Sequence, residues 1–309
     1  MPLFIIALTI LVSSAFPSMA TEPVEKVRKW TRSFTLTSQT QPVSVDNRFG
    51  TLRIVTWDRE EAKIEITITA KARSESEAEK LAEEVEIRTT DAEKGVSVTT
   101  RFQEGRISMG NSRHGQTVCI DMTVTLPSTQ PLKASNKFGK LMLPDYRGPV
   151  ELISHFGKLE AGNLSTVTRI EVEFGSLALE GMSGGEGKVD IEFSKGTIRN
   201  LGGQVDMRLS FTGDMVLGLT HGLKSLDLRT SYSNTALEIP ADFQADIDMS
   251  TSFGKFRNDS RSDLLLKAGT SGDRSGKTRY RLGSGGIPIR ASTEFGNITL
   301  RDRKGSLSL

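Results

Sequence analysis

The stretch ASNKFGKL at residues 134–141 decides the fold, because variants of it recur along the rest of the chain. The later copies are LISHFGKL (152–159), IEVEFGSL (170–177), VDIEFSKG (189–196), MRLSFTGD (207–214), LRTSYSNT (228–235), MSTSFGKF (249–256) and ASTEFGNI (291–298). An earlier copy, VDNRFGTL, stands apart at residues 45–52. The aromatic residues at the fifth position follow one another, from 138 on, after 18, 18, 19, 18, 21, 21 and 42 residues, and the last interval is twice 21.

Within each copy, apolar or small residues at positions one, three and five alternate with mostly polar residues at positions two and four. This period of two is typical of a strand with one buried face. A unit of this length cannot bury its own apolar face, and helical repeats need roughly 33 residues or more. We therefore predict a predominantly all-β chain, a parallel β-solenoid of about nine coils of 18–21 residues each. A sandwich of hairpins is the alternative, although reversing strands rarely repeat one motif in register.

The aromatic residues are expected to form one column inside the solenoid. Stacked copies would place the rings in a continuous core. Phe193→Ala should then leave a cavity and cost about 3–5 kcal/mol, with a milder loss at Phe295 near the end of the repeats. The column consists of Phe138, Phe156, Phe174, Phe193, Phe211, Tyr232, Phe253 and Phe295.

The residues before the repeats predict a different, α+β organisation. Residues 21–130 are assigned to a capping region and residues 131–309 to the repeat domain. Strands are predicted at 34–37, 43–45, 52–57, 62–69, 85–89, 96–102 and 118–126. One helix should begin after Ser74 or Ser76, because Glu77 or Glu79 three residues later completes a capping box. Such a region could cover the exposed edge of the first coil.

Residues 1–20 have the composition of a secretory signal peptide. They contain no charged side chain, and an apolar run from Leu3 to Val12 leads to Ser18-Met19-Ala20, a small-x-small cleavage site. The run is too short to span a bilayer comfortably, and no later stretch reaches the roughly 18 apolar residues that a spanning helix needs. We expect an exported protein of the periplasm or cell surface, without a transmembrane segment once the signal is removed.

Several motifs follow one another in a recognisable order. They are Asn-x-Phe-Gly at 47–50, a strand ending in Thr56-Trp57-Asp58, Ser-x-Ser-x-x-Glu at 74–79, VTLP at 124–127 and LGSGGIPIRASTEFGNITL at 282–300. In this order the chain resembles the exported putative-adhesin family of unknown function, which is related to head domains of autotransporter-like adhesins. The resemblance spans nearly the whole chain after residue 20. It implies a β-solenoid with an adhesin-like role and names no activity.

The residue types that carry catalysis or bind metals do not form a familiar motif. The three histidines, His114, His155 and His221, have no Cys, His or Asp at metal-ligand spacing. No Gly-x-Ser-x-Gly elbow and no phosphate-binding loop occurs. We therefore expect no metal, no cofactor and no enzymatic activity.

The residues just before the aromatic positions would stack on one outer face. They read Lys137, His155, Glu173, Glu192, Ser210, Ser231, Ser252 and Glu294. Glu173 and Glu192 would become neighbours, at a separation like that of the carboxylates in a retaining glycosidase. A solvated face is the favoured interpretation, and a polysaccharide-active β-helix enzyme is the alternative.

Lysines recur two places after the aromatic residue, at Lys140, Lys158, Lys195 and Lys255. Such a stripe is a candidate site for an anionic polysaccharide or lipid headgroups. The other interpretation is edge protection and solubility, since Lys blunts sheet edges. The formal net charge of +2 is smaller than the basic excess usual for a nucleic-acid binder, so we expect no nucleic-acid partner.

The single cysteine, Cys119, excludes an internal disulfide. Its position in TVCIDMTV (117–124) places it on the polar side of a strand, where a free, half-covered thiol is expected. A disulfide between two chains is the alternative.

Together these features favour a non-enzymatic, exported binding or structural module of the bacterial cell envelope. Its expected partner is an envelope polysaccharide or an envelope protein. A scaffold or sensor of envelope stress, acting through a protein partner, is a further alternative.

The signal-peptide prediction can be checked directly. If residues 1–20 are removed on export, N-terminal sequencing of the mature protein should begin near Thr21. Recovery of intact Met1 on a cytosolic protein would contradict it.

Overall fold

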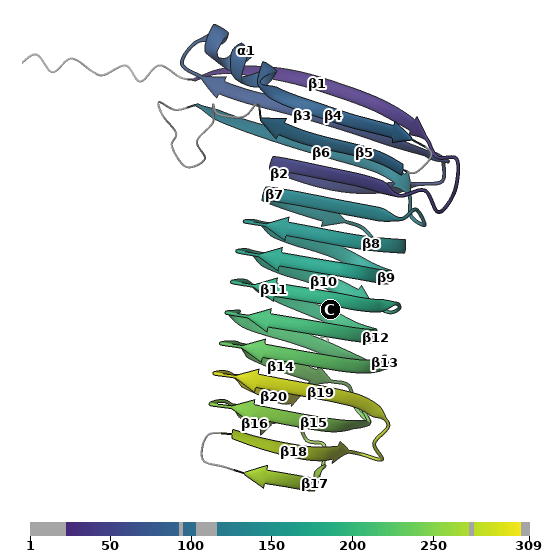
Figure 1. The fold of residues 1–309 in the computed structure, drawn as a ribbon, viewed down its shortest axis with the longest axis vertical. Helices are drawn as coiled ribbons and strands as arrows, with labels where there is room; N and C mark the ends of the chain where they lie inside the picture. The colour runs from purple at the N-terminus through teal and green to yellow at the C-terminus, as the bar shows by residue number, and fades with distance from the viewer. Residues whose placement is uncertain (1–22, 93–94, 103–115, 272–274, 304–309) are drawn as a thin grey trace, which may run out of the picture.

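The computed structural model describes residues 23–92, 95–102, 116–271 and 275–303. Within these ranges the chain forms twenty strands, all joined in one hydrogen-bonded network, and one helix. The strands stack along one long axis, with the helix at one end (Figure 1). The predicted signal segment lies outside the described residues. In the part of the chain that the structure describes, no helix has the length and apolarity needed to cross a bilayer.

An antiparallel sheet forms the N-terminal end of the molecule. Strand β3 (Glu61–Ala72) pairs antiparallel with β1 (Val24–Thr35) on one side and with β6 (Thr117–Pro127) on the other. The alternation in β3 is complete, because Ala62 and the isoleucines at 64, 66 and 68 are buried while the residues between them are not. This long strand was predicted from the same alternation.

Helix α1 (Glu75–Glu83) packs against β1 and β3. The Ser74 hydroxyl caps it by accepting a hydrogen bond from the Glu77 backbone N–H at 3.3 Å, as the capping motif predicts. Ala78 and Ala82 are buried on the face that meets the sheet. Because both side chains are single methyl groups, this short helix can lie close to the strands.

Strand β2 (Val43–Trp57) joins this end of the molecule to the repeats. It pairs in parallel with β7 (Leu132–Leu143), so that Gly50 lies in register with Gly139. Its first half also pairs with β5 (Gly95–Phe102), whose other partner is β4 (Val85–Ala92), and its second half pairs with β6. The copy at 45–52, isolated in the sequence, therefore lies directly on the copy at 134–141. The parallel stack begins inside the predicted capping region.

Each following repeat pairs in parallel with the repeat before it. Lys137 lies in register with His155, His155 with Glu173, Glu173 with Glu192 and Glu192 with Ser210. A row of hairpins would reverse direction and would not give this register. The strands of this part are β8 (Tyr146–His155), β9 (Lys158–Glu173), β10 (Ser176–Met182), β11 (Glu186–Glu192), β12 (Lys195–Ser210), β13 (Asp214–Ser231) and β14 (Asn234–Ile239).

The C-terminal repeat is inserted between two repeats that precede it. Strand β19 (Ile287–Glu294) pairs in parallel with both β13 and β15 (Ala245–Ser252). Strand β20 (Asn297–Asp302) likewise pairs with β14 and with β16 (Lys255–Asn258). Figure 1 shows these late strands, in yellow, between green ones.

The interval of 42 residues between the last two aromatic positions is twice 21, which predicts one further coil without the aromatic motif, and this prediction is wrong. Instead, β17 (Leu264–Ser271) and β18 (Ser275–Leu282) form an antiparallel pair. Strand β18 also pairs antiparallel with β15, on the edge opposite to β19. The pair therefore closes the stack at the end opposite to the helix, and Phe295 is not at the end of the repeats.

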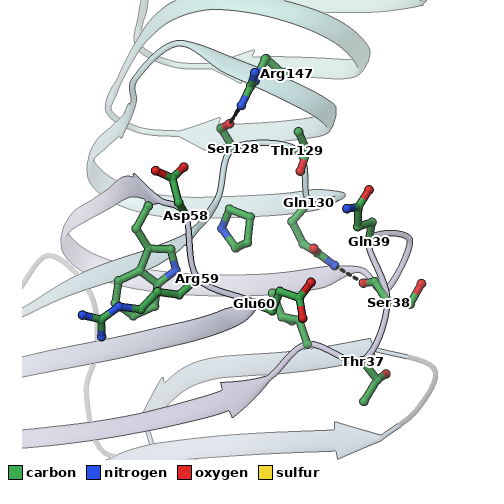
Figure 2. A pocket seen from close by; sticks show the side chains of 13 residues that line it. Thr37, Ser38, Gln39, Asp58, Arg59, Glu60, Ser128, Thr129, Gln130 and Arg147 are labelled. Atoms are coloured by element: carbon green, nitrogen blue, oxygen red, sulfur yellow. Dashed lines mark hydrogen bonds between the residues drawn. The ribbon is translucent and has the colours of Figure 1, made fainter.

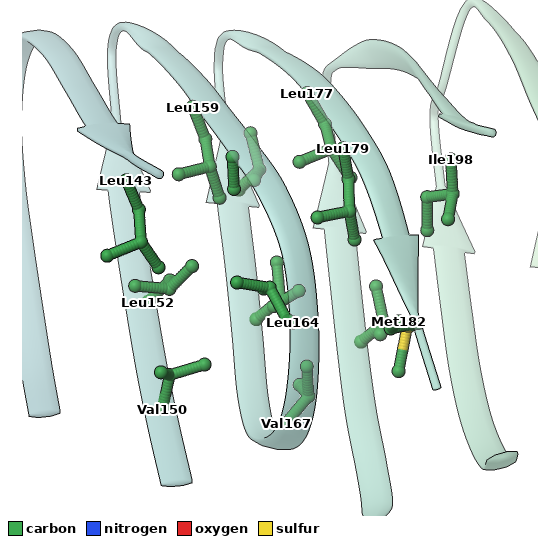
Figure 3. Packing of buried hydrophobic residues seen from close by; sticks show 14 of the residues in the cluster. Leu143, Val150, Leu152, Leu159, Leu164, Val167, Leu177, Leu179, Met182 and Ile198 are labelled. Atoms are coloured by element: carbon green, nitrogen blue, oxygen red, sulfur yellow. The ribbon is translucent and has the colours of Figure 1, made fainter. Parts of the chain in front are cut away.

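The core consists mostly of aliphatic side chains from successive repeats (Figure 3). Positions one and three of the motif are buried, as predicted: Leu152, Ile170, Val172, Val189 and Ile191 are all at most 2% exposed. The residues after each bend supply the opposite wall, which includes Leu141, Leu159, Leu177, Ile198 and Leu217. In the first of these repeats like residues lie in register, Leu141 with Leu159 and Leu159 with Leu177.

Two buried asparagines explain the first residue of the Asn-x-Phe-Gly motif. The Asn47 amide nitrogen donates to the Ile120 carbonyl at 2.9 Å and to the Asn136 side-chain oxygen at 3.1 Å. The Asn136 amide nitrogen donates to the Gly50 carbonyl at 3.0 Å. These side chains satisfy buried backbone groups at the bends, which would otherwise cost free energy.

The glycine after the aromatic residue is required because successive bends approach closely. A Cβ atom added at Gly157 would lie 1.8 Å from the Gly139 carbonyl oxygen, and one added at Gly175 would lie 2.0 Å from that of Gly157. Backbone atoms cannot move aside as a side chain can. At Gly213, in a repeat without this glycine, the nearest atom to an added Cβ is the Cβ of Lys195 at 3.5 Å, an ordinary contact.

Replacement of these glycines by alanine should therefore have unequal effects. Gly157→Ala forces two bends apart, and overpacking of this kind typically costs about 1–3 kcal/mol. Gly213→Ala adds the same methyl group at an ordinary contact distance and should change the free energy of unfolding by less than about 0.5 kcal/mol. Urea denaturation of both variants measures the difference. Equal free energies would contradict the close packing of the bends.

Candidate functional site

The aromatic residues of the repeats form a single stacked column, the aromatic ladder. Neighbouring rings lie 4.7–5.2 Å apart between centroids, with planes within 10° of parallel. Phe102 meets the first ring edge-on at 5.2 Å. The order along the ladder is Phe49, Phe138, Phe156, Phe174, Phe193, Phe211, Tyr232, Phe295 and Phe253.

The ladder lies on the outside of the stack, so the prediction of a buried aromatic core is wrong. Phe156 is 43% exposed, Phe193 44% and Phe253 53%. The cause is the backbone, because every ladder residue has a positive φ, between 47° and 63°. A residue in this left-handed region ends the alternation of the strand. The fifth side chain therefore points outward, although positions one and three point inward.

The ladder stabilises the bends more than it offers a binding platform. A non-glycine residue held in the left-handed region costs on the order of 1–3 kcal/mol, and each stacked aromatic pair returns about 0.5–1.5 kcal/mol. The inner rings are covered on both faces by their neighbours. A ligand that stacks on an aromatic face finds the faces of these inner rings occupied, and only their edges reach the solvent.

The four predicted lysines do not form one continuous stripe. Lys140 and Lys158 are neighbours in register, and both contact Glu160, at 3.5 and 2.5 Å. These two ammonium groups hold the pKa of the Glu160 carboxyl below its usual value, chiefly through the hydrogen bond from Lys158. Ser176 separates Lys158 from Lys195. Asp214, Asn234 and Asn297 separate Lys195 from Lys255.

The residues before the aromatic positions form an outer column beside the ladder, in the predicted order except that Glu294 lies between Ser231 and Ser252. The Lys137 ammonium group lies 5.6 and 5.7 Å from the ring centroids of Phe138 and Phe156. Glu173 and Glu192 are direct neighbours. The outer column runs Arg48, Lys137, His155, Glu173, Glu192, Ser210, Ser231, Glu294 and Ser252.

One cluster in this region escaped the search for motifs. The Nε2 atom of His155 lies 2.8 Å from Oε1 of Glu171 and 3.8 Å from Oε2 of Glu173. Metal-binding motifs have short ligand spacings, whereas Glu171 and Glu173 follow His155 by 16 and 18 positions. They lie beside it because the parallel repeat places β9 next to β8. The repeat length itself was the signal that could have found them.

A polar recess lies where the N-terminal sheet meets the stack (Figure 2). It has a volume of about 260 Å³. The Trp57 indole N–H donates to the Glu61 carbonyl at 2.8 Å, and the Arg59 guanidinium lies 5.0 Å from the Trp57 ring centroid. Arg147 donates to the Ser128 hydroxyl at 3.0 Å. Trp57 and Pro127, from two motifs of the family resemblance, line this recess, so these motifs shape the junction.

Cys119 is exposed on β6, and its sulfur lies 3.7 Å from a carboxylate oxygen of Asp121. The strand atoms around the thiol and the Asp121 carboxylate raise its pKa above the usual value. The thiol therefore stays protonated at neutral pH, which makes it a poor nucleophile.

The known proteins that match this chain are solved structures. No protein-family model matches it, and no curated protein matches it. It is similar to a putative adhesin from Bacteroides fragilis, at 12% identity and a TM-score of 0.45, over 88% of this chain and 97% of that one. A putative adhesin from Parabacteroides merdae matches at 13% identity and a TM-score of 0.36, over 90% and 97%. A putative lipid binding protein from Parabacteroides distasonis matches at 10% identity and 0.36, over 88% and 96%. At these values the likeness assigns neither family nor activity.

The order of rings in the ladder makes a stability prediction. Phe295 stacks on Tyr232 and Phe253, each at 4.8 Å, whereas among the described residues Phe253 stacks on Phe295 alone. Phe295→Ala should therefore lower the free energy of unfolding more than Phe253→Ala. Phe193→Ala removes two stacked contacts and should cost roughly 1–3 kcal/mol. Denaturant unfolding of the three variants gives the values.

Two further variants serve as controls for this series. Phe193→Gly also removes the ring but relieves the positive φ of 47°, so it should be less destabilising than Phe193→Ala. Glu192→Ala changes an exposed neighbour and should stay within about 0.5 kcal/mol of the parent chain. If Glu192→Ala were as costly as Phe193→Ala, the ladder would have no special role in stability.

Proposed function

We propose that this chain is a non-enzymatic, exported binding or structural module of the bacterial cell envelope, with an adhesin-like role. The observation that carries the proposal is the parallel register of the stack. It repeats each outward-facing position at the spacing of neighbouring strands, about 4.8 Å. Rows of side chains at a fixed repeat suit an extended, repetitive ligand better than a compact substrate.

The architectural part of the proposal is a β-solenoid of about nine coils, related to the head domains of autotransporter-like adhesins. Residues 131–309 form most of it, and residues 21–130 provide its cap and its first coil. The parallel pairing of β2 with β7 supports this arrangement, because it makes the copy at 45–52 part of the stack. Removal of residues 1–20 on export would leave this body in the periplasm or at the cell surface.

The ligand that we propose is an anionic polysaccharide of the envelope, held at the basic end of the ladder. Lys140 and Lys158 lie after the bends there, while Arg48 and Lys137 lie before them, in register. Among the described residues, Lys195 has no ion-pair partner and extends the basic surface beyond Ser176. Lys255 lies farther along the stack, beyond Asp214, Asn234 and Asn297. An envelope protein is the other partner class.

A matched pair of charge variants tests the ligand. The variant Lys140, Lys158, Lys195, Lys255→Ala removes the four predicted lysines. The variant Lys29, Lys80, Lys224, Lys267→Ala removes the same charge from exposed positions elsewhere. Binding to polygalacturonate should be lost in the first and kept in the second. Binding by the parent chain should weaken steeply as salt rises, since charges are screened within about 10 Å at 0.1 M.

Four outcomes would contradict this proposal. Equal binding in both variants, or an equal loss of binding in both, would show that the four predicted lysines are not the binding site. Release of shorter oligosaccharides by the parent chain, abolished by Glu173→Gln, would favour the enzymatic alternative instead. Enrichment of one protein and no glycan from envelope extracts would favour the scaffold or sensor.

A further inference from the structure

We propose that His155, Glu171 and Glu173 form a binding site for a divalent transition-metal cation of the zinc class. The site lies on the outer face of the stack, where β8 meets β9. It is independent of the proposed function, which involves no metal.

The geometry of the three side chains suits such an ion. Their ligand atoms all lie within 4.8 Å of one another. Zinc binds imidazole nitrogen at about 2.0–2.1 Å and carboxylate oxygen at about 2.0–2.2 Å, so small side-chain rotations bring all three donors to one ion. The side chains are 25%, 25% and 34% exposed, which leaves one side open for a water molecule as fourth ligand.

The backbone holds these donors in place before any ion binds. His155 lies in register with Glu173, and Ile153 with Glu171, in the parallel pairing of β8 with β9. His155 and Glu173 each precede a ladder residue, and those two rings, Phe156 and Phe174, stack at 5.0 Å within 5° of parallel. A preformed site costs little ordering entropy when it binds its ligand.

Carboxylates outnumber the cations on this face, where Lys137 lies in register with His155 on the side away from Glu173. On the far side of β9, strand β11 places Asp190 beside Glu171 and Glu192 beside Glu173, and like charges opposite one another destabilise a sheet. Arg169 contacts Glu171 at 2.5 Å and Asp190 at 3.9 Å, and Arg208 lies in register with Asp190. Among the described residues, the only ion-pair partner of Glu173 or Glu192 is His155. A divalent cation beside Glu173 would offset this excess negative charge.

The donor set determines the class of cation. An imidazole nitrogen with two carboxylates suits zinc and its neighbours, whereas calcium and magnesium prefer oxygen ligands alone. The expected ligand is therefore Zn²⁺, and Ca²⁺ should bind more weakly.

The experiment is isothermal titration of ZnCl₂ into the full-length, metal-free chain. The parent chain should bind one zinc ion at this site. His155→Ala lacks one of the three ligands, so its zinc affinity at this site should be more than about tenfold lower. His221→Ala is the matched control, because His221 lies against Phe243, away from this site, and its affinity should be unchanged. Glu173→Gln keeps the shape of the side chain and should weaken binding as well.

A variant with the opposite effect makes the test sharper. Arg169→Gln frees the Glu171 carboxylate and removes a nearby positive charge, so zinc affinity should rise. Saturable zinc binding that is equal in His155→Ala and the parent, or no binding at all in the parent, would overturn the proposal. So would unchanged or weaker binding in Arg169→Gln, or calcium binding as tight as that of zinc.

Discussion

The close approach of successive bends is the constraint on which the rest of the structure depends. Each repeat turns at the same point as the one before, and wherever glycine follows the turn, its backbone almost touches the carbonyl group of its neighbour. Glycine meets this requirement after the turn in six of the nine copies, and Ser194, Thr212 or Ser233 stands there in the other three. At the turn itself, every copy has an aromatic residue in the left-handed region. The stacked rings return part of the free energy that this conformation costs. Parallel register, burial of the aliphatic positions and exposure of the rings all follow from this turn.

The sequence predicts the repeat and its strands well but misplaces the rings. Period two is a sound guide as long as the backbone stays extended, so Leu152 and Ile170 were correctly assigned to the core. Phe156 follows the same count, yet a single residue with positive φ reverses its direction. Nothing in the alternation reveals that change. The combination of an invariant aromatic position with a following glycine was the available sign of a special turn.

Long-range order was the other feature that the sequence could not supply. Residues that recur at one position of a repeat are expected to be neighbours in chain order, and Phe193 and Phe211 are. Phe295 departs from chain order because the pair β17–β18 takes the outer edge of β15. The predicted lysine stripe is broken because the repeats between Lys195 and Lys255 have Asp214 and two asparagines at this position. In contrast, His155 and Glu173 meet because the repeat is regular there.

The inserted C-terminal repeat has a consequence for how the stack is assembled. During synthesis, β13 and β15 are complete before β19 exists, and each then presents an open edge to the solvent. Strand β19 then pairs with both edges at once. A chain that ends before residue 287 would retain two unpaired parallel edges near this end of the stack and would be prone to pair with another copy. Assembly of this end therefore cannot proceed strictly from the N-terminus to the C-terminus, although most of the stack can grow in that way.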